Sequence, residues 1–195
     1  MIFTRNPELG KVKTRLAKTV GDQVALDIYK FLLQHTKTVT QDLECDKQVH
    51  YSVKVREGDI WDEPFFQKKQ QQGEDLGTRM AHAFQEAFSE GYEKIVIIGS
   101  DLFDISAEDF ELAFNSLDDH QVVIGPAEDG GYYLLGMTTF IPEVFQQKNW
   151  GTQTVLNDTL KDLQHYTYQL LEERNDVDLY EDIEGIEAFQ QFINT

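Results

Sequence analysis

The sequence predicts an α/β fold with a mostly parallel sheet that is covered by helices on both faces. Apolar runs typical of strands alternate with segments of helical periodicity along most of the 195 residues. Residues 94–99 contain a continuous apolar run, the pattern of a strand buried on both sides. Because 41% of the residues are hydrophobic and 27% are charged, we expect residues 1–195 to form one globular domain.

The first half of the chain begins with a short strand and a long helix. Residues 1–4 have the pattern of the end of an apolar strand, and a loop with a proline and a glycine follows. The apolar residues of 22–42 recur at helical spacing, which predicts one long helix. Residues 48–55 alternate between apolar and polar side chains, so we expect a second strand there. Residues 75–90 return to the helical pattern.

The second half continues the alternation after the central run. Ser106 and Asp109 have the spacing of a helix start, in which the third helical residue binds back to the cap. The remaining pattern predicts, in order, strands at 121–125 and 132–137, a helix at 152–164, a strand at 167–171 and a last helix from about Tyr180. In sheets of this class ligands bind beyond the carboxyl ends of the strands, and we expect every motif described below to lie there.

Charge and apolar content argue against several classes of protein. A net charge of -18 repels nucleic acids and anionic membranes. No apolar run approaches the roughly 20 residues that span a bilayer, and the start lacks a signal-peptide pattern. The single cysteine, Cys45, cannot form an internal disulfide and is assigned no role, and the five histidines are not at metal-ligand spacing. We therefore expect a cytoplasmic protein with no nucleic acid partner and no membrane insertion.

The basic loop at 5–16 is the first functional signal. Four of the 17 basic residues lie within the first 15 positions, where an even spread predicts about one. They are Arg5, Lys11, Lys13 and Arg15. These side chains, together with backbone N–H groups of the turn at Gly10, can bind phosphate oxygens, although the spacing is not that of a Walker loop. A solvated basic turn is the alternative.

Two further motifs suit a nucleotide and a metal. Gln72 and the glycine-containing loop that ends at Gly77 and Thr78 can hydrogen-bond the edge of a base, but the residue types alone favour an ordinary loop and helix cap. Ser100 and Asp101 follow the central strand, where a carboxylate can hold Mg²⁺ or Mn²⁺ against a diphosphate. A helix-capping or turn aspartate is the alternative for Asp101.

The last two motifs are a glycine pair and an acidic segment. Asp129, Gly130, Gly131 and Tyr132 suggest backbone in close approach to a ligand, and a hairpin with a tight Asp-Gly turn explains the same residues. Asp178 lies on the way into the last predicted helix, where acids are common because they complement the helix dipole. A functional role for Asp178 depends on its meeting Asp101 in space.

Taken together and in this order, the motifs resemble those of bacterial GT-A-like glycosyltransferases of the selenodomain-associated type. The resemblance spans nearly the whole chain and rests on residues 3–16, 75–80, 98–101, 125–133 and 176–182. It implies a GT-A fold, that of nucleotide-diphospho-sugar transferases. Residues 72–78 are similar to the base-binding loop of sugar-nucleotide pyrophosphorylases, and 13–16 to an element of phospholactate guanylyltransferases. Asp178 falls where related cytidylyltransferases place their second metal-binding acid.

The chain departs from that family in two places. The family has a proline two residues after the Ser-Asp pair, where this chain has Phe103, so the turn that carries Asp101 is expected to differ. The family also has several apolar residues before Phe3, and a strand of about four residues is short for a sheet core. We therefore expect the natural reading frame to begin before Met1, or residues to have been lost there.

Three functions follow from these motifs. The first is a metal-dependent glycosyltransferase, which takes a nucleotide sugar and a small-molecule acceptor. In its predicted site, phosphate is bound by the cations Arg5, Lys11, Lys13 and Arg15, and the nucleotide by Gln72, Gly77, Thr78, Gly10 and Ser100. Mg²⁺ or Mn²⁺ is bound by Asp101 and Asp178. Asp129 acts as the base, and Gly130, Gly131 and Tyr132 lie beside the acceptor. The second is a nucleotidyltransferase that moves a nucleoside monophosphate from an NTP to a phosphorylated acceptor. The third is an inactive nucleotide-binding regulator, which Phe103 supports.

Overall fold

The computed structural model describes residues 1–193, and its centre is a seven-stranded sheet. The strands lie in the order β3-β2-β1-β4-β6-β5-β7. Their bounds are β1 Ile2–Thr4, β2 Gln48–Tyr51, β3 Gln67–Gln70, β4 Ile95–Ile98, β5 Val122–Pro126, β6 Tyr132–Met137 and β7 Tyr168–Leu170. Among the described strands, only β6 runs antiparallel, between β4 and β5, and the other pairs are parallel. The predicted mostly parallel sheet is therefore confirmed.

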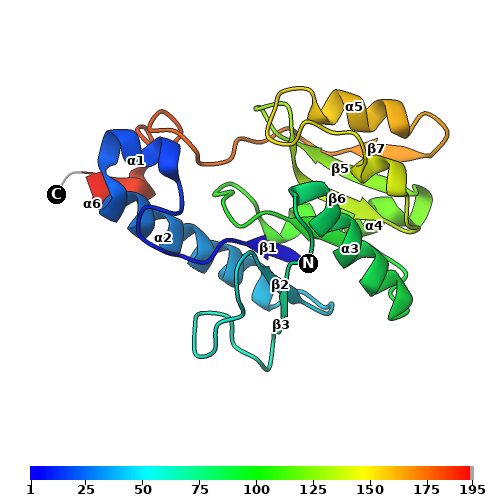
Figure 1. Ribbon diagram of the computed structural model, residues 1–195, viewed down its shortest axis with the longest axis horizontal. Coiled ribbons are helices and arrows are strands. Elements are labelled where there is room, and N and C mark those ends of the chain that lie inside the picture. Colours follow the sequence, from blue (N-terminus) through cyan, green and yellow to red (C-terminus); the bar gives the residue numbers. More distant parts are fainter. Residues whose placement is uncertain (194–195) are drawn as a thin grey trace.

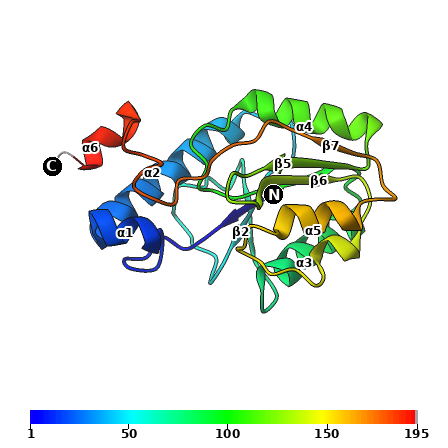
Figure 2. The ribbon, with the colours of Figure 1, turned by 90° about the horizontal axis from the view of Figure 1, so that it is seen from above.

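Helices cover both faces of this sheet. Their bounds are α1 Thr14–Val20, α2 Asp22–Gln41, α3 Leu76–Ser89, α4 Ala107–Asp119, α5 Val155–Asp162 and α6 Gln190–Ile193, with short 3-10 turns at Pro142–Phe145 and Glu187–Phe189. Figure 2 shows α4 and α2 on one side of the strands and α3 and α5 on the other. Two apolar clusters follow this division, one with residues of α2 and α4 and one with residues of α3.

The central strand β4 explains why both faces need cover. Ile95 and Ile97 lie in the α3 cluster, whereas Val96 and Ile98 lie in the α2 and α4 cluster. All four are buried, and each contributes roughly 1.5–3 kcal/mol when taken from water. An unbroken apolar run at 94–99 was the sequence signal for this strand, because successive side chains of a strand point to opposite faces.

Helix starts at α3 and α4 are fixed by local hydrogen bonds. The Asp75 carboxylate accepts from Thr78 N at 2.8 Å, and the Asp109 carboxylate accepts from the backbone N–H of Ser106 at 2.8 Å. Each bond satisfies a polar group that the first helical turn would leave unpaired. The predicted helix start after Ser106 is confirmed.

A third cluster joins α1, α2 and the C-terminal part of the chain. Residues 171–186 run from β7 back across the molecule to α1 and α6 (Figure 1). Val177, Ile183 and Phe189 pack there against buried leucines of α1 and α2. Phe103 belongs to this cluster, with its ring 4.9 Å from that of Phe189 and 5.8 Å from that of Phe31.

Two predicted elements differ most from the observed ones, while the helix predicted at 152–164 is shorter, at Val155–Asp162, and the strand predicted at 167–171 is Tyr168–Leu170. The second strand ends at Tyr51, because the Asn6 carboxamide oxygen accepts from the backbone of Val53 at 3.0 Å and of Lys54 at 3.3 Å, which draws the chain away from the sheet. The last helix does not begin at Tyr180. The Asp182 carboxylate instead accepts from the backbone N–H groups of Asp178 and Leu179 in a run of turns.

Two observed elements had no sequence signal. The edge strand β3 has the sequence Gln-Lys-Lys-Gln, which carries no apolar alternation. The short helix α1 lies inside the basic loop that was predicted to lead directly to the long helix. Among the described helices, none combines the length and the apolar composition needed to cross a bilayer.

Candidate active site

All five motifs lie at one edge of the sheet. The basic loop follows β1, the Gln72 loop follows β3, Asp101 follows β4, the turn at 127–131 joins β5 to the antiparallel β6, and the acidic segment follows β7. Because the carboxyl ends of parallel strands share an edge, the topology brings these segments together. The expectation that the motifs gather there is confirmed.

The acidic segment is inserted between two of the other motifs. Val177 N donates to the backbone oxygen of Asp101 at 3.1 Å, and Glu128 N donates to that of Arg174 at 3.0 Å. Isolated bridges pair Leu102 with Asp176 and Ala127 with Arg174. The segments at 101–102, 127–128 and 174–177 are therefore held side by side by their backbones, which fixes where their acidic side chains emerge.

Lys13 and Asp101 form the ion pair at the middle of this edge. Lys13 Nζ donates to Asp101 Oδ2 at 2.8 Å, with side-chain exposures of 5% for the lysine and 40% for the aspartate. Lys13 is the residue before α1 and has a φ of 46°, a conformation that costs a non-glycine residue roughly 1–2 kcal/mol. A strained backbone conformation of this kind persists only where the surrounding structure holds it in place, and such conformations are found most often at functional sites.

Arg15 and Asp178 form a second, more exposed pair. Arg15 Nη1 lies 2.8 Å from Asp178 Oδ2, and the side chains are 61% and 31% exposed. Of the four cations of the basic loop, Lys13 and Arg15 thus each bind an acid that was predicted to hold metal. Arg5 and Lys11 are exposed and have no carboxylate partner among the described residues.

Ser100 is connected to the basic loop by hydrogen bonds. Its hydroxyl lies 3.2 Å from that of Tyr29 and 3.3 Å from that of Thr4, in a buried network. The Tyr29 hydroxyl in turn accepts from the backbone N–H of Arg5 at 2.9 Å. Burial raises the pKa of Tyr29, so its hydroxyl keeps its proton for this network. Ser100 therefore positions the loop, and its predicted contact with the nucleotide stays a prediction.

A cavity of about 220 Å³ opens beside the Lys13–Asp101 pair. Its acidic lining consists of Asp101, Asp129 and Asp176, and its aromatic lining includes Tyr132 and Trp150. Burial, and then the charge of Asp101, raise the pKa of Asp176 to about 6. Asp178 is not among the lining residues, so Asp176 is the acid of the Asp-Val-Asp motif that faces the cavity with Asp101.

Sequence reasoning missed Asp176 and Trp150. The Asp-Val-Asp motif contained the first, but no spacing rule chooses between its two acids. Trp150 had no signal at all, because it lies in a loop between two helical segments. A smaller cavity of about 100 Å³ lies at the other end of β4, beside Met1 and Cys45, and contains none of the predicted site residues.

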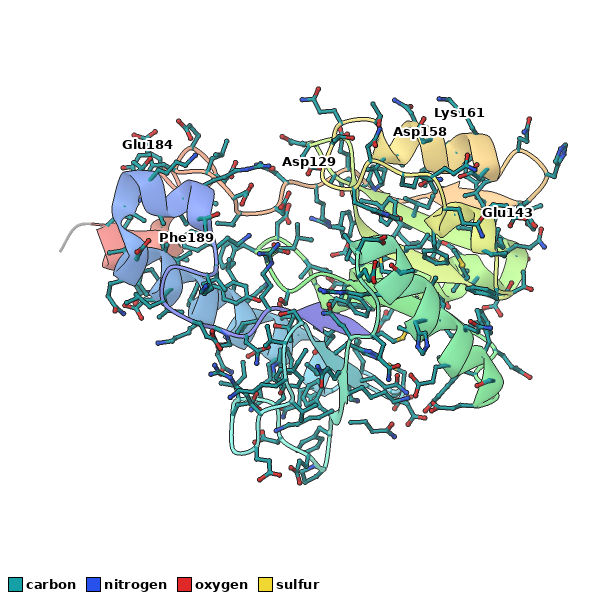
Figure 3. The ribbon with its side chains drawn as sticks, in the orientation of Figure 1. Asp129, Glu143, Asp158, Lys161, Glu184 and Phe189 are labelled. Atoms are coloured by element: carbon teal, nitrogen blue, oxygen red, sulfur yellow. The ribbon has the colours of Figure 1, made fainter. Side chains whose placement is uncertain are left out.

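The turn at 127–131 is a hairpin turn that also borders the cavity. β5 and β6 pair antiparallel on either side of it, so the hairpin interpretation is correct. The Asp129 carboxylate accepts from Gly131 N at 2.8 Å. Gly130 has a φ of 86°, and a Cβ there would overlap the backbone of Gln153. Figure 3 shows Asp129 on this turn. The predicted acceptor-side role of Gly130, Gly131 and Tyr132 stays a prediction.

The Gln72 loop contacts the cavity through its apolar residues. Thr78 is engaged with Asp75 at the start of α3, and Gly77 is buried beneath Trp150, where a Cβ would overlap the indole nitrogen. Gln72 is exposed. Leu76 and Met80 line the cavity instead. Gly77 and Thr78 therefore have structural partners, and base recognition by this loop stays a prediction.

The acidic residues of the cavity could bind a metal ion only together with phosphate groups of a bound ligand. In the described part of the chain, no group of three or more histidine, cysteine, aspartate or glutamate side chains could hold a metal ion. Mg²⁺ is commonly bound by one or two carboxylates together with substrate phosphates. Asp101 and Asp176 could supply the two carboxylates.

Gly10, with a φ of 69°, turns the basic loop before Lys11.

Phe103 does not disturb the carboxylate two residues before it. Its ring packs on Phe31, His35 and Phe189, away from the cavity lining. The residue that replaces the family's proline thus anchors the turn after β4 to the third cluster.

Comparison with known proteins agrees with this architecture. The family described as "Uncharacterized protein conserved in bacteria (DUF2064)" matches residues 33–152. A protein of Desulfovibrio desulfuricans G20, provisionally described as a nucleotide-diphospho-sugar transferase, is 34% identical over 97% of this chain and 89% of its own, with a TM-score of 0.84. No curated protein matches the sequence.

More distant structures share only the fold. Rv0371c of Mycobacterium tuberculosis, solved with manganese, is 12% identical over 100% of this chain and 97% of its own, with a TM-score of 0.56. CMP:2-keto-3-deoxy-manno-octonic acid synthetase, solved with CTP, is 11% identical over 98% of each chain, with a TM-score of 0.55. The predicted nucleotide-diphospho-sugar transferase fold is confirmed, and the narrower resemblance to selenodomain-associated glycosyltransferases stays a prediction.

Proposed function

This chain belongs to the DUF2064 family, and we propose that it is a metal-dependent transferase that uses a nucleotide-diphospho-sugar as donor. The observation that carries the proposal is the contact of the basic loop, through Lys13, with Asp101, which lines one cavity together with Asp176 on the carboxyl edge of the sheet. Cations for a diphosphate and carboxylates for a divalent ion are thereby adjacent, in a protein whose net charge of -18 would otherwise repel nucleotides.

The basic loop would bind the diphosphate. Arg5 and Lys11 are exposed and without carboxylate partners in the described structure, so they are available to phosphate at little cost. Lys13 is buried beside Asp101, and neutralises charge where the diphosphate and the carboxylate meet. Arg15 is held by Asp178, and we assign that pair to positioning the loop against the acidic segment.

The divalent ion would be held by Asp101 and Asp176 with the donor's phosphates. Mg²⁺ or Mn²⁺ would supply positive charge to the departing diphosphate. Asp178 was the expected second ligand, but its carboxylate binds Arg15 and does not line the cavity, which favours Asp176. The manganese and the CTP bound by two proteins of this fold are compatible with this assignment.

The protein's own residues would act by electrostatics and by positioning. Cations of the loop stabilise negative charge that develops on the leaving diphosphate. Asp129 is the candidate base, since its carboxylate borders the cavity and its oxygen is oriented by Gly131 N. The hairpin turn of Gly130, Gly131 and Tyr132 would shape the acceptor side.

A thermal-shift panel tests this function. Nucleoside diphosphates, nucleoside triphosphates and common nucleotide sugars are each added with and without Mg²⁺ or Mn²⁺ to the wild type and to Asp101→Ala. A ligand at 100 times its Kd stabilises by about 2.7 kcal/mol, which is several degrees for a chain of this size. We expect a metal-dependent shift with one base, lost in Asp101→Ala. No shift with any nucleotide would contradict the proposal.

A nucleotidyltransferase is the second candidate. The cationic loop and the synthetase of the same fold favour it, because an NTP carries one more phosphate for those cations to bind. Release of pyrophosphate from an NTP, only when acceptor is present, would select this function over glycosyl transfer.

A further inference from the structure

The acidic cavity has a lining that selects the charge of its ligand. Asp101, Asp129 and Asp176 line it, and in the described structure no lysine, arginine or histidine side chain does. Lys13 lies beside this lining, and its Nζ is already bound to Asp101 at 2.8 Å. Asp101 and Asp176 are assigned to the divalent ion that meets the donor's diphosphate, which leaves Asp129 without a cation. A further phosphate or carboxylate in the cavity would therefore meet the Asp129 carboxylate and no free cation, which is unfavourable at short distance.

The same lining selects for hydrogen-bond donors. An ionised carboxylate only accepts hydrogen bonds, so a ligand group that satisfies Asp129 must bring donors. Asp129 accepts one bond, from Gly131 N, and its other oxygen has no partner among the described residues. Hydroxyl groups supply donors without adding negative charge.

The opposite part of the cavity is aromatic and apolar. Trp150 and Tyr132 stand nearly perpendicular, with ring centroids 6.3 Å apart and an angle of 88° between the ring planes. Leu76, Met80 and Phe3 complete this side. A surface of this kind packs against the C–H face of a ring while the ring's polar edge stays free.

The volume of the cavity suits a group of about one ring. The cavity measures about 220 Å³, below the roughly 300–1,000 Å³ of pockets that enclose drug-sized ligands. A single ring with its substituents is of the size that this space encloses. The basic loop, which suits the diphosphate, lies outside the cavity lining.

We propose that this cavity binds an uncharged, hydroxylated ring such as a hexose, with Trp150 as the wall on which the ring packs, and that it excludes sugars that carry a phosphate or a carboxylate elsewhere than on the anomeric oxygen. The proposal rests on the proposed function and names the class of group that the site accepts. The ring could belong to the donor's sugar or to the acceptor, since both have the same chemistry. Trp150 is assigned as a specificity residue.

The chain carries a built-in reporter for this test. It has two tryptophans, of which Trp61 is 2% exposed and packs on Phe66 in the core. The variant Trp61→Phe leaves Trp150 as the only tryptophan. Its fluorescence is recorded while glucose, mannose and galactose, and the 6-phosphate of each, are titrated against the full-length protein. Each titration is run alone and with the nucleoside diphosphate that gives the largest thermal shift.

We expect a saturable change in Trp150 fluorescence with at least one neutral hexose, and at least tenfold weaker binding of its 6-phosphate. Equal or tighter binding of the phosphate would overturn the proposal, as would the absence of any change with every neutral hexose. A change produced by a free nucleoside would also overturn it, because the ring in the cavity would then be a base. A response only to hexose linked to the nucleotide identifies the donor's sugar, and a response to free hexose identifies the acceptor.

Variants connect the signal to the residues. Trp150→Ala removes the wall, and Gly77→Ala keeps the indole but must displace it, because the added Cβ overlaps its nitrogen and lies 2.7 Å from the backbone oxygen of Phe145. Both should weaken hexose binding in calorimetry at least fivefold. Phe65→Ala, at an exposed aromatic outside the cavity, is the matched control. Unchanged hexose affinity in both cavity variants would contradict the role of Trp150.

The charge is tested separately. Asp129→Asn should reduce the ratio between the affinities for a hexose and for its 6-phosphate by several fold, whereas Asp158→Asn should leave this ratio unchanged. Asp158 lies on α5, where it binds Lys161, and both are labelled in Figure 3. If nucleotides bind but no neutral hexose changes Trp150, the cavity proposal fails and the transferase stands. If no nucleotide binds, the transferase fails whatever the sugars do.

Discussion

Lys13 holds the Asp101 carboxylate at 2.8 Å from a backbone conformation that lysine rarely adopts, with a φ of 46°. The pair joins the loop after β1 to the end of β4, two segments 88 residues apart in the chain. It places a buried cation directly beside the acid on which the proposed chemistry depends. Lys13 and Asp101 therefore belong to one electrostatic unit, and a change in either should be felt by a bound diphosphate.

Loss of the Lys13 charge should weaken nucleotide binding. We expect Lys13→Met to raise the Kd for the preferred nucleotide at least tenfold, because a charge-assisted contact is worth about 1.5–3 kcal/mol. Calorimetry checks this. Lys18→Met, at the exposed end of α1, is the control and should bind as the wild type does. Equal affinities in the two variants would count against a phosphate role for Lys13.

The two acids of the Asp-Val-Asp motif should behave differently. Asp176→Asn is expected to abolish the metal-dependent part of the thermal shift with nucleotide, because Asp176 lines the cavity with Asp101. Asp178→Asn should keep that shift and change stability by about 1 kcal/mol or less, as is usual for an exposed ion pair. The opposite pattern would return the second metal site to Asp178.

The hairpin turn should not tolerate a side chain at Gly130. A left-handed residue other than glycine costs about 1–2 kcal/mol, and at Gly130 an added Cβ also overlaps Gln153. Gly151 has a similar φ of 77° with open space around it, so Gly151→Ala measures the backbone cost alone. In urea unfolding, Gly130→Ala should lose at least about 1 kcal/mol more than Gly151→Ala. Equal losses would show that the turn can move away from Gln153.

Acid should destabilise the fold through His50. Burial lowers the pKa of His50 to about 3, from 6.5 in the unfolded chain. Between these values the unfolded chain binds a proton that the folded chain does not, so stability falls as the pH falls from 6.5 toward 3, by up to about 1.4 kcal/mol per unit. His50→Phe keeps a ring beside Phe3, whose centroid lies 5.2 Å away, and should reduce the slope.

The measurement for His50 is urea unfolding from pH 6.5 to 4.5 for the wild type, His50→Phe and the exposed-site control His165→Gln. Only His50→Phe should reduce the dependence of the free energy of unfolding on pH. If all three slopes agree, the acid sensitivity comes from other groups.

Local patterns predicted most of the fold. The unbroken run at 94–99 predicted the central strand, and the helical spacing of 22–42 predicted α2, because burial on these faces follows directly from periodicity. The strand β3 could not be predicted, since four polar residues pair there only because β2 offers its edge. The end of β2 depended on Asn6, which lies more than 40 residues away in the sequence.

The site was predictable in its segments but not in its contacts. Strand order brings the five motifs to one edge, and that follows from the α/β pattern. Which acid faces the cavity depends on the bond from Val177 N to the backbone oxygen of Asp101, a long-range contact without a sequence signal. Trp150 reaches the cavity only because Gly77 leaves room for its indole.

The most direct test of the account is ³¹P NMR of the protein with the nucleotide sugar chosen by the thermal-shift panel, Mg²⁺ and a neutral hexose acceptor. We expect the resonances of the nucleoside diphosphate to appear with the wild type and not with Asp101→Asn. Accumulation of the nucleoside diphosphate at the same rate in Asp101→Asn, or no nucleoside diphosphate with the wild type, would contradict glycosyl transfer at this site.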